Sequence, residues 1–273
     1  MLEAVFPRSP LAAATLAALI GCGGGGGGGS TPTNPTSNPP AQSVNPCGAI
    51  AQGPSALTAI TNGTDCSAEN TPIMRLNMRD QHGGGLGSCS GTVITPRAVL
   101  TAAHCLDEGV NTVLVWRGVG EQIAASSFRG HPGYSGNDPA VDVGVVIVGE
   151  DLGRPAVPLL VSRSGQVGET AVVAGWGQDL QQRPAFLRAG TTTLSGVDSS
   201  VLRTLFSPTS SGICFGDSGG PILLAEQGTW SIAGIISATS GTTCNTGEHY
   251  YGAVRNQTIQ SFIREHVPEA TLR

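Results

Sequence analysis

The stretch that most constrains the fold of this chain runs from Cys214 to Pro221 and reads CFGDSGGP. A serine between glycines on a tight turn exposes its hydroxyl beside free backbone N–H groups, which suits a nucleophile with an oxyanion hole. The stretch also fits the G-x-S-x-G nucleophile elbow of α/β-hydrolases, in which the acid and then the histidine follow the serine. Only 55 residues follow Ser218, and none of them is an aspartate. The general base and its acid are therefore expected upstream of Ser218, in the order His…Asp…Ser.

A histidine with suitable neighbours lies upstream, in the sequence TAAHC, which holds His104 and ends at Cys105. This sequence follows an apolar run, and the region from Cys89 to Cys105 reads as strand, turn and strand. Together with CFGDSGGP, this region resembles the trypsin/chymotrypsin-like serine protease family, and the resemblance covers roughly residues 60–267. Both motifs in one chain, in this order, are a highly specific signal for that family.

The resemblance implies an all-β fold, in which two six-stranded antiparallel β-barrels pack together and a short C-terminal helix follows. We expect the protease domain at 60–273, with the first barrel at about 60–155, the second at about 165–255 and the helix at about 256–267. Short apolar runs that alternate with turn residues after His104 are typical of small β-barrels. Asn256 can cap the helix, because an Asn side chain accepts a hydrogen bond from a first-turn N–H.

The triad acid is expected in the segment from His131 to Val146, which resembles the family's His-Pro…Asp-Ile-Ala-Leu segment. An apolar run follows Asp142 and places its carboxylate at the start of a buried strand, so Asp142 is the expected acid. Asp138 is the alternative, but Pro139 follows it and no strand does.

These residues predict a serine endopeptidase that cleaves protein or peptide substrates through an acyl-enzyme. His104 would accept the proton of the Ser218 hydroxyl, and Asp142 would hold the imidazole in the required tautomer. The N–H groups of Gly216 and Ser218 would bind the oxyanion. No metal or cofactor is expected, because the His and Cys residues lack paired metal-ligand spacing. Two alternatives remain open: a non-catalytic homologue that only binds partners, and an esterase that uses the same site.

The resemblance assigns substrate binding to Gly212, Ser237, Thr239 and His249. An aspartate six residues before the nucleophile would indicate preference for Arg or Lys, and Gly212 stands there instead. Thr239 stands where the family often has glycine and would narrow the pocket, His249 falls near another wall position, and Ser237 matches a serine that contacts the triad acid. A narrowed pocket suits small uncharged side chains, whereas a positive His249 would favour an acidic side chain.

A zymogen is indicated by the sequence that starts at Ile60, with Pro72 at a spacing similar to that of the family's activated N-terminus. In the family, cleavage before this isoleucine frees an ammonium that pairs with the aspartate preceding the nucleophile, here Asp217. The segment 47–59 would then be a propeptide. The alternative is that Ile60 is an ordinary strand residue.

The resemblance also implies disulfides. Cys89–Cys105 and Cys214–Cys244 match two family bridges that brace the histidine loop and the substrate pocket. Cys66 matches a position that often pairs with a cysteine in the second barrel, but no cysteine lies between Cys105 and Cys214. Cys47 is the remaining candidate, and a Cys47–Cys66 bridge would keep the propeptide attached after cleavage.

The N-terminal region reads as an export signal. Arg8 precedes the apolar segment 11–20, which is too short for a membrane helix and suits a signal peptide at 1–21. The sequence LIGC that ends at Cys22 resembles the lipobox of bacterial lipoproteins, in which the cysteine carries the lipid anchor. Residues 22–46 are Gly-, Ser-, Thr- and Pro-rich and would form a disordered tether. We expect a lipid-anchored protein of the cell envelope, or a secreted protein if the signal peptide is an ordinary one.

Charge and cysteine content narrow the partners and the compartment. The net charge is −5 and the 14 basic residues form no cluster, which argues against nucleic acid as a partner. Seven cysteines are present, and lipidation of Cys22 would leave six, an even number that reads as disulfides in an exported domain. A monomer is expected.

Overall fold

The computed structural model describes residues 45–50, 60–118, 120–136, 138–178 and 186–273. The predicted lipidation site at Cys22, the signal peptide and most of the tether lie outside these ranges. Within the described residues, no helix is both long enough and apolar enough to cross a membrane.

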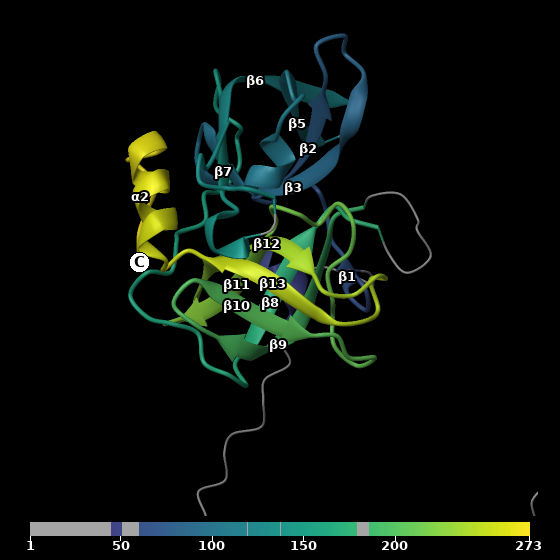
Figure 1. Cartoon of the computed structure of the whole chain (residues 1–273), viewed down its shortest axis with the longest axis vertical. Helices are drawn as coiled ribbons and strands as arrows, with labels where there is room; N and C mark the ends of the chain where they lie inside the picture. The colour runs from purple at the N-terminus through teal and green to yellow at the C-terminus, as the bar shows by residue number, and fades with distance from the viewer. Residues whose placement is uncertain (1–44, 51–59, 119, 137, 179–185) are drawn as a thin grey trace, which may run out of the picture. The chain divides into compact units, whose positions relative to one another are not determined.

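The first barrel is antiparallel and closes in the order β2-β3-β4-β7-β6-β5 (Figure 1). Its strands are β2 (Ile73–Arg79), β3 (Gly85–Thr95), β4 (Ala98–Thr101), β5 (Thr112–Gly118), β6 (Glu121–Gly130) and β7 (Gly144–Val148). Two 3-10 helices interrupt this half of the chain, η1 (Ala103–Leu106) after β4 and η2 (Pro139–Val141) before β7. The helix η1 contacts β6 and β7 of the first barrel, whereas η2 contacts β13 of the second. In β2, buried and half-buried residues alternate toward the end of the strand, as expected where one face of a strand lines a core.

The second barrel is also antiparallel and closes because β8 pairs with both β9 and β11. Its strands are β8 (Thr170–Gly175), β9 (Arg188–Val197), β10 (Val201–Leu205), β11 (Pro221–Glu226), β12 (Thr229–Thr239) and β13 (Glu248–Ala253). The C-terminal helix α2 (Gln257–His266) follows, and the Asn256 side chain accepts a hydrogen bond from the Thr258 N–H at its start. The fold predicted from the sequence, two six-stranded barrels and a short helix, is confirmed.

The predicted boundary of the first barrel at about residue 60 is wrong. The short strand β1 (Thr64–Asp65) pairs with β9 of the second barrel, and Thr61 forms a bridge with Gly212. Ile60 is buried in the core of the second barrel. The first barrel therefore begins only at β2, because the segment before it crosses to the second barrel and hydrogen-bonds there.

A short helix precedes the two barrels, at the start of the segment that the sequence analysis interprets as a propeptide. This helix, α1 (Pro46–Ile50), buries Cys47 and Ile50, and Ile50 joins the larger hydrophobic core. Its Cys47 forms a disulfide with Cys66, so the predicted bridge is confirmed. The start of the predicted propeptide is thus packed on the residues of the barrels and covalently bound to Cys66.

A pair of tryptophans connects the two barrels. Trp116 of β5 and Trp176, directly after β8, meet edge to face with ring centroids 4.8 Å apart, a favourable aromatic geometry. The Trp176 Nε1–H donates a 3.0 Å hydrogen bond to the Ile73 carbonyl at the start of β2. Trp176 therefore joins the two barrels through one aromatic contact and one hydrogen bond.

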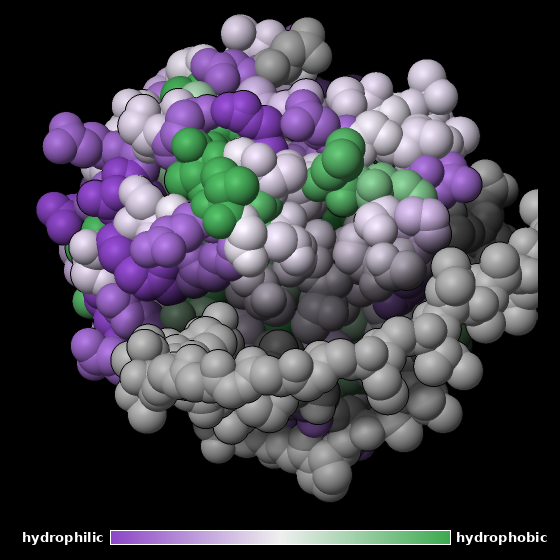
Figure 2. Space-filling model, turned by 90° about the horizontal axis from the view of Figure 1, so that it is seen from below, coloured by the Kyte–Doolittle hydropathy of each residue, from purple (hydrophilic) through white to green (hydrophobic). Residues whose placement is uncertain are grey.

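Hydrophobic residues on the surface are scattered. On the face seen in Figure 2, hydrophobic atoms form separate patches among neutral and hydrophilic residues. The most exposed large hydrophobic side chains among the described residues come from different elements: Leu86, Val167, Phe186, Leu205 and Phe215. Large continuous apolar patches mark stable interfaces, and this face carries none among the residues that the structure describes.

Candidate active site

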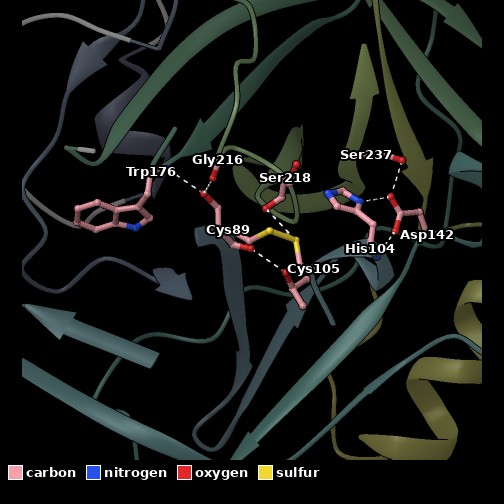
Figure 3. The surroundings of a disulfide bond; sticks show 10 residues. Cys89, His104, Cys105, Asp142, Trp176, Gly216, Ser218 and Ser237 are labelled. Atoms are coloured by element: carbon pink, nitrogen blue, oxygen red, sulfur yellow. Dashed lines mark hydrogen bonds and ion pairs between the residues drawn. A yellow bond between two sulfur atoms is a disulfide. The ribbon is translucent and has the colours of Figure 1, made fainter. Parts of the chain in front are cut away.

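His104 and Asp142 meet between the two barrels. The Nδ1 of His104 lies 2.7 Å from Oδ2 of Asp142, and the His104 backbone N–H donates a 3.0 Å hydrogen bond to Oδ1. The Ser237 hydroxyl of β12 donates a further 2.6 Å hydrogen bond to Oδ2 (Figure 3). A carboxylate bound at both oxygens fixes the orientation of the imidazole, with Nε2 free for the nucleophile.

The Asp142 carboxylate is fully buried. Burial alone would raise its pKa, but the hydrogen bonds and charge of His104 and the Ser237 hydroxyl lower the pKa below its ordinary value. It is therefore ionised at neutral pH and can stabilise a protonated His104. Asp138, the alternative acid, is exposed and accepts a hydrogen bond from the Ala140 N–H at the start of η2. The structure thus places Asp142, and not Asp138, against His104.

Ser218 completes the group. It lies on the turn between Cys214 and Pro221, and the imidazole of His104 lies between it and Asp142 (Figure 3). The Cys89–Cys105 disulfide ties η1, which carries His104, to β3. Ser218 and His104 are half-buried, so a substrate can reach both of them.

The turn around Ser218 holds its backbone N–H groups free. Gly216 has a φ of +94°, a left-handed conformation that glycine adopts without strain. The Gly216 carbonyl accepts a hydrogen bond from the Ser90 hydroxyl, and the Ser218 carbonyl accepts one from the Ser90 backbone N–H. Neither N–H group of these two residues donates to another described residue. Both are free to bind a developing oxyanion, the role that the sequence predicted for them.

Ser90 is a positioning residue that the sequence analysis missed. Its hydroxyl accepts a 2.8 Å hydrogen bond from the backbone N–H of Trp176 and donates a hydrogen bond to the Gly216 carbonyl. The backbone N–H of Ser90 donates to the Ser218 carbonyl. A serine inside a strand gives no sequence signal for such a role. Its partners lie 86 and 126 residues away in sequence.

Asp217 belongs to the nucleophile turn, and its side chain is buried. Its carboxylate accepts 2.8 Å hydrogen bonds from the N–H groups of Gly177 and Cys214. Burial raises its pKa to about 6, although these hydrogen bonds and the charge of Arg188 act in the opposite direction. The hydrogen bonds and the nearby positive charge thus offset only part of the free-energy cost of burying this carboxylate.

The segment that starts at Ile60 packs against the loop that precedes the nucleophile turn. Ile60 is buried, and the Thr61 carbonyl accepts a 3.0 Å hydrogen bond from the Gly212 N–H. The Asn62 side chain donates to the carbonyls of Pro208 and Ser210. These contacts bind the segment to the loop that leads to the nucleophile turn.

The four predicted substrate-binding residues lie on three segments of the second barrel. Ser237 and Thr239 belong to β12 and His249 to β13, where it pairs with Thr239, and Gly212 precedes the nucleophile turn. The Cys214–Cys244 disulfide, also predicted, ties this turn to the loop after β12.

The interpretation of His249 as a positive group is wrong. Its side chain is completely buried, and burial lowers its pKa to about 4. The imidazole is therefore neutral at neutral pH and provides no charge to pair with an acidic side chain.

Three comparisons relate this chain to known proteins. Residues 60–263 match the family model described as Trypsin. Trypsin beta from Drosophila erecta is 29% identical over 195 residues, which cover 62% of this chain and 76% of the relative. Chymotrypsin-C from Bos taurus is 28% identical over 237 residues, covering 73% of this chain and 85% of the relative. A solved HL collagenase structure has a TM-score of 0.64 at 21% identity and covers 77% of this chain and 99% of its own.

Proposed function

Since the chain belongs to the trypsin family and is a serine endopeptidase, we propose that it cleaves protein or peptide substrates through the triad of His104, Asp142 and Ser218. The observation that carries this proposal is the buried Asp142 carboxylate, bound by His104 at both oxygens and by the Ser237 hydroxyl. A purely structural ion pair would not require an accessible imidazole that lies between an ionised carboxylate and a serine side chain.

The reaction follows from these positions. The Ser218 Oγ attacks the scissile carbonyl carbon while Nε2 of His104 accepts the hydroxyl proton, and Asp142 stabilises the resulting imidazolium. The N–H groups of Gly216 and Ser218 bind the oxyanion, and loss of one such donor typically costs about 3–4 kcal/mol. His104 then protonates the leaving amine, and the acyl group stays on Ser218. A water molecule, deprotonated by His104, attacks the acyl carbon and releases the acid, and the proton returns to Ser218.

A fluorophosphonate probe tests this proposal, because it reacts with a serine only when a neighbouring base activates it. We expect labelling of the activated protein at Ser218 and none in Ser218→Ala. Absence of labelling in the activated wild type would favour the non-catalytic homologue. Hydrolysis of esters without hydrolysis of any peptide would favour the esterase.

We also propose that the protein is made as a zymogen and that cleavage before Ile60 activates it. The support is the buried Asp217, whose carboxylate has two N–H partners and a raised pKa. A second support is that the segment after Ile60 hydrogen-bonds to the loop that precedes the nucleophile turn. A new ammonium at Ile60 would supply the charge that this carboxylate needs. The propeptide would remain attached through α1 and the Cys47–Cys66 disulfide.

We propose further that the protein is exported and held at a membrane by a lipid on Cys22, with residues 22–46 as a tether. The support is the sequence alone: the apolar segment at 11–20, the lipobox-like LIGC and the polar composition of the tether. Three disulfides in the protease domain fit an oxidising compartment outside the cytoplasm. The scattered surface hydrophobic residues are in keeping with a monomer.

A further inference from the structure

Arg188, the first residue of β9, carries its charge into the interior of the protein. Only 3% of its side chain is exposed, and arginine is almost never buried without a partner. Its Nε lies 3.3 Å from Oδ1 of Asp65, and its Nη1 donates a 3.0 Å hydrogen bond to the Gly177 carbonyl. The guanidinium is thus a buried positive charge at the point where β1, β9 and the segment after β8 meet.

Gly177 connects this guanidinium to the buried Asp217 carboxylate. Its carbonyl accepts the hydrogen bond from Arg188, and its N–H donates a 2.8 Å hydrogen bond to Oδ1 of Asp217. A Cβ atom added to Gly177 would lie 2.5 Å from Cγ of Asp217, and one added to Gly175, which pairs with Arg188, would also collide with this carboxylate. The two opposite charges therefore lie against the same segment, residues 175–177, and the charge of Arg188 lowers the pKa of Asp217 against the effect of burial.

The position of Asp217 affects catalysis because this residue separates Gly216 from Ser218, whose N–H groups would bind the oxyanion. An ionised carboxylate without compensating charge is unstable in the interior and would turn toward water. The two neighbouring peptide groups are bonded to Asp217, so they would move with it and the oxyanion hole would be lost. The charge of Arg188 favours the buried position at neutral pH, where the Asp217 carboxylate is ionised.

This arrangement is present in the uncut chain. The structure is that of the continuous chain, in which residues 59 and 60 are joined, so the nitrogen of Ile60 is an amide and not an ammonium. The Asp217 carboxylate is nevertheless buried and accepts two backbone hydrogen bonds. Nδ1 of His104 also lies 2.7 Å from the Asp142 carboxylate. The uncut chain therefore already has the geometry that activation would be expected to produce.

We propose that Arg188 is a positioning residue that keeps the Asp217 carboxylate buried before cleavage, so that the uncut precursor has a basal endopeptidase activity. This inference rests on the proposed endopeptidase function and deepens the proposed activation. In the uncut chain the guanidinium compensates part of the carboxylate charge, and after cleavage the ammonium of Ile60 would compensate more of it. Cleavage would then raise an activity that already exists, and the first cleavages between precursor molecules would need no other protease.

The test measures the reactivity of Ser218 in uncut and cut chains of the same preparation. A trace of activated wild type converts part of the precursor to the cut form, and the mixture receives a short pulse of the fluorophosphonate probe at neutral pH. Reduction then breaks the Cys47–Cys66 disulfide, so that intact-mass spectrometry separates labelled uncut chains from labelled cut chains. We expect uncut wild-type chains to be labelled about 10- to 100-fold more slowly than cut chains, the effect of one additional charged hydrogen bond.

Three variants test the role of the Arg188 charge. Arg188→Gln should slow labelling of the uncut chain at least about tenfold relative to the cut chain of the same variant, because only the cut chain has the Ile60 ammonium as a replacement. Arg188→Lys keeps the charge and should restore most of the uncut rate. Arg163→Gln removes another arginine, whose Nη2 lies 2.6 Å from Oε1 of Glu169, and should leave the ratio of the two rates at its wild-type value.

The ratio of uncut to cut rates within one variant separates positioning from folding, because poor folding lowers both rates alike. Equal losses in the two forms of Arg188→Gln would therefore overturn the inference, and so would an Arg188→Lys chain that behaves like Arg188→Gln. Absence of label on uncut wild-type chains while cut chains react would overturn it as well, but would leave the proposed function in place. If neither form of the wild type reacts, the proposed endopeptidase function fails and the inference falls with it.

Discussion

The Ser90 hydroxyl of β3 donates a 2.9 Å hydrogen bond to the carbonyl of Gly216, which connects a strand of the first barrel to the oxyanion loop of the second. The same hydroxyl accepts a hydrogen bond from the Trp176 N–H, and Ser90 is completely buried. The bond fixes the position of the Gly216 carbonyl, and the Gly216 N–H group has no backbone partner among the described residues. The barrel interface thus positions the proposed oxyanion loop as well as joining the two halves of the protein.

Replacement of Ser90 by alanine should lower kcat more than it raises KM, because the oxyanion develops only in the transition state. The change also leaves the Trp176 N–H without its partner, which should lower the free energy of unfolding by about 1–3 kcal/mol. Steady-state kinetics and chemical denaturation measure the two effects. Ser88→Ala on the same strand serves as the control, and an equal loss of kcat in both variants would contradict a positioning role for Ser90.

Replacement of Asp142 by asparagine should reduce turnover about 10⁴-fold, the effect known for a serine protease whose triad acid is changed in this way. The amide stabilises the wrong imidazole tautomer and cannot stabilise the imidazolium. Asp138→Asn is the matched control and should retain nearly full activity, because Asp138 only accepts a hydrogen bond at the start of η2. A severe loss in Asp138→Asn with a mild loss in Asp142→Asn would show that the acid is wrongly assigned.

The uncleaved precursor should become less stable as the pH rises from about 4 to 6. Burial raises the pKa of Asp217 to about 6, so across this range the folded precursor holds a proton that the unfolded chain has released. Stability falls with rising pH wherever the folded state binds more protons, here by on the order of 3 kcal/mol. Thermal unfolding of the Ser218→Ala precursor measures this dependence.

Asp217→Asn in the same Ser218→Ala background is the control for the other groups that titrate in this range. The difference in stability between the two precursors should change between pH 4 and 6 and stay constant above that range. A constant difference across the whole range would mean that Asp217 is already paired in the precursor, and the zymogen proposal would lose its main support.

The candidate catalytic residues could be identified from the sequence because each lies in a short contiguous motif. His104 stands in TAAHC, Ser218 in GDSGGP, and Asp142 just before an apolar strand. The barrels and disulfides followed from the resemblance that these motifs carry. These features depend on local sequence, and the structure bears out the fold and all three bridges.

The features that could not be predicted depend on contacts between distant residues. Ser90 reads as an ordinary strand residue until β3 is placed beside the turn of Ser218. The burial and neutral state of His249 follow from its packing between β10 and β12, and sequence alone allowed a positive histidine. The segment after Ile60 precedes the first barrel in sequence but binds the second, because its hydrogen-bonding partners lie at Gly212 and on β9.

Cys22→Ser should release the protein from membranes without changing the specific activity of the activated protease domain. The tether carries almost no apolar residues that could pack on the domain, so anchoring and catalysis should separate. Membrane fractionation and labelling with a radioactive fatty acid measure the anchor, and active-site titration normalises the activity. Lipid labelling that persists in Cys22→Ser would show that the lipobox interpretation is wrong.

Activation should be autocatalytic between molecules, because the cleavage site fits the proposed pocket. The proposed cut follows Leu57-Thr58-Ala59, with neither Arg nor Lys before it for a tryptic activator. A pocket narrowed by Thr239, as the sequence predicts, would accept a short side chain such as that of Ala59, so a little active enzyme could cleave the remaining precursor. Purified Ser218→Ala precursor should stay uncut alone and be cut between Ala59 and Ile60 by added wild type.

The Ala59→Phe change in the Ser218→Ala precursor is the matched control and should block this cleavage, because a Phe side chain is too large for a pocket narrowed by Thr239. After cleavage of the Ser218→Ala precursor, the propeptide should leave the domain only under reducing conditions, because Cys47–Cys66 holds it. Mass spectrometry of the mixture identifies the new N-terminus. Lack of an Ile60 N-terminus in the mixture would exclude autoactivation at this site. An active wild type that begins at another residue would also remove Ile60 as the group that pairs with Asp217.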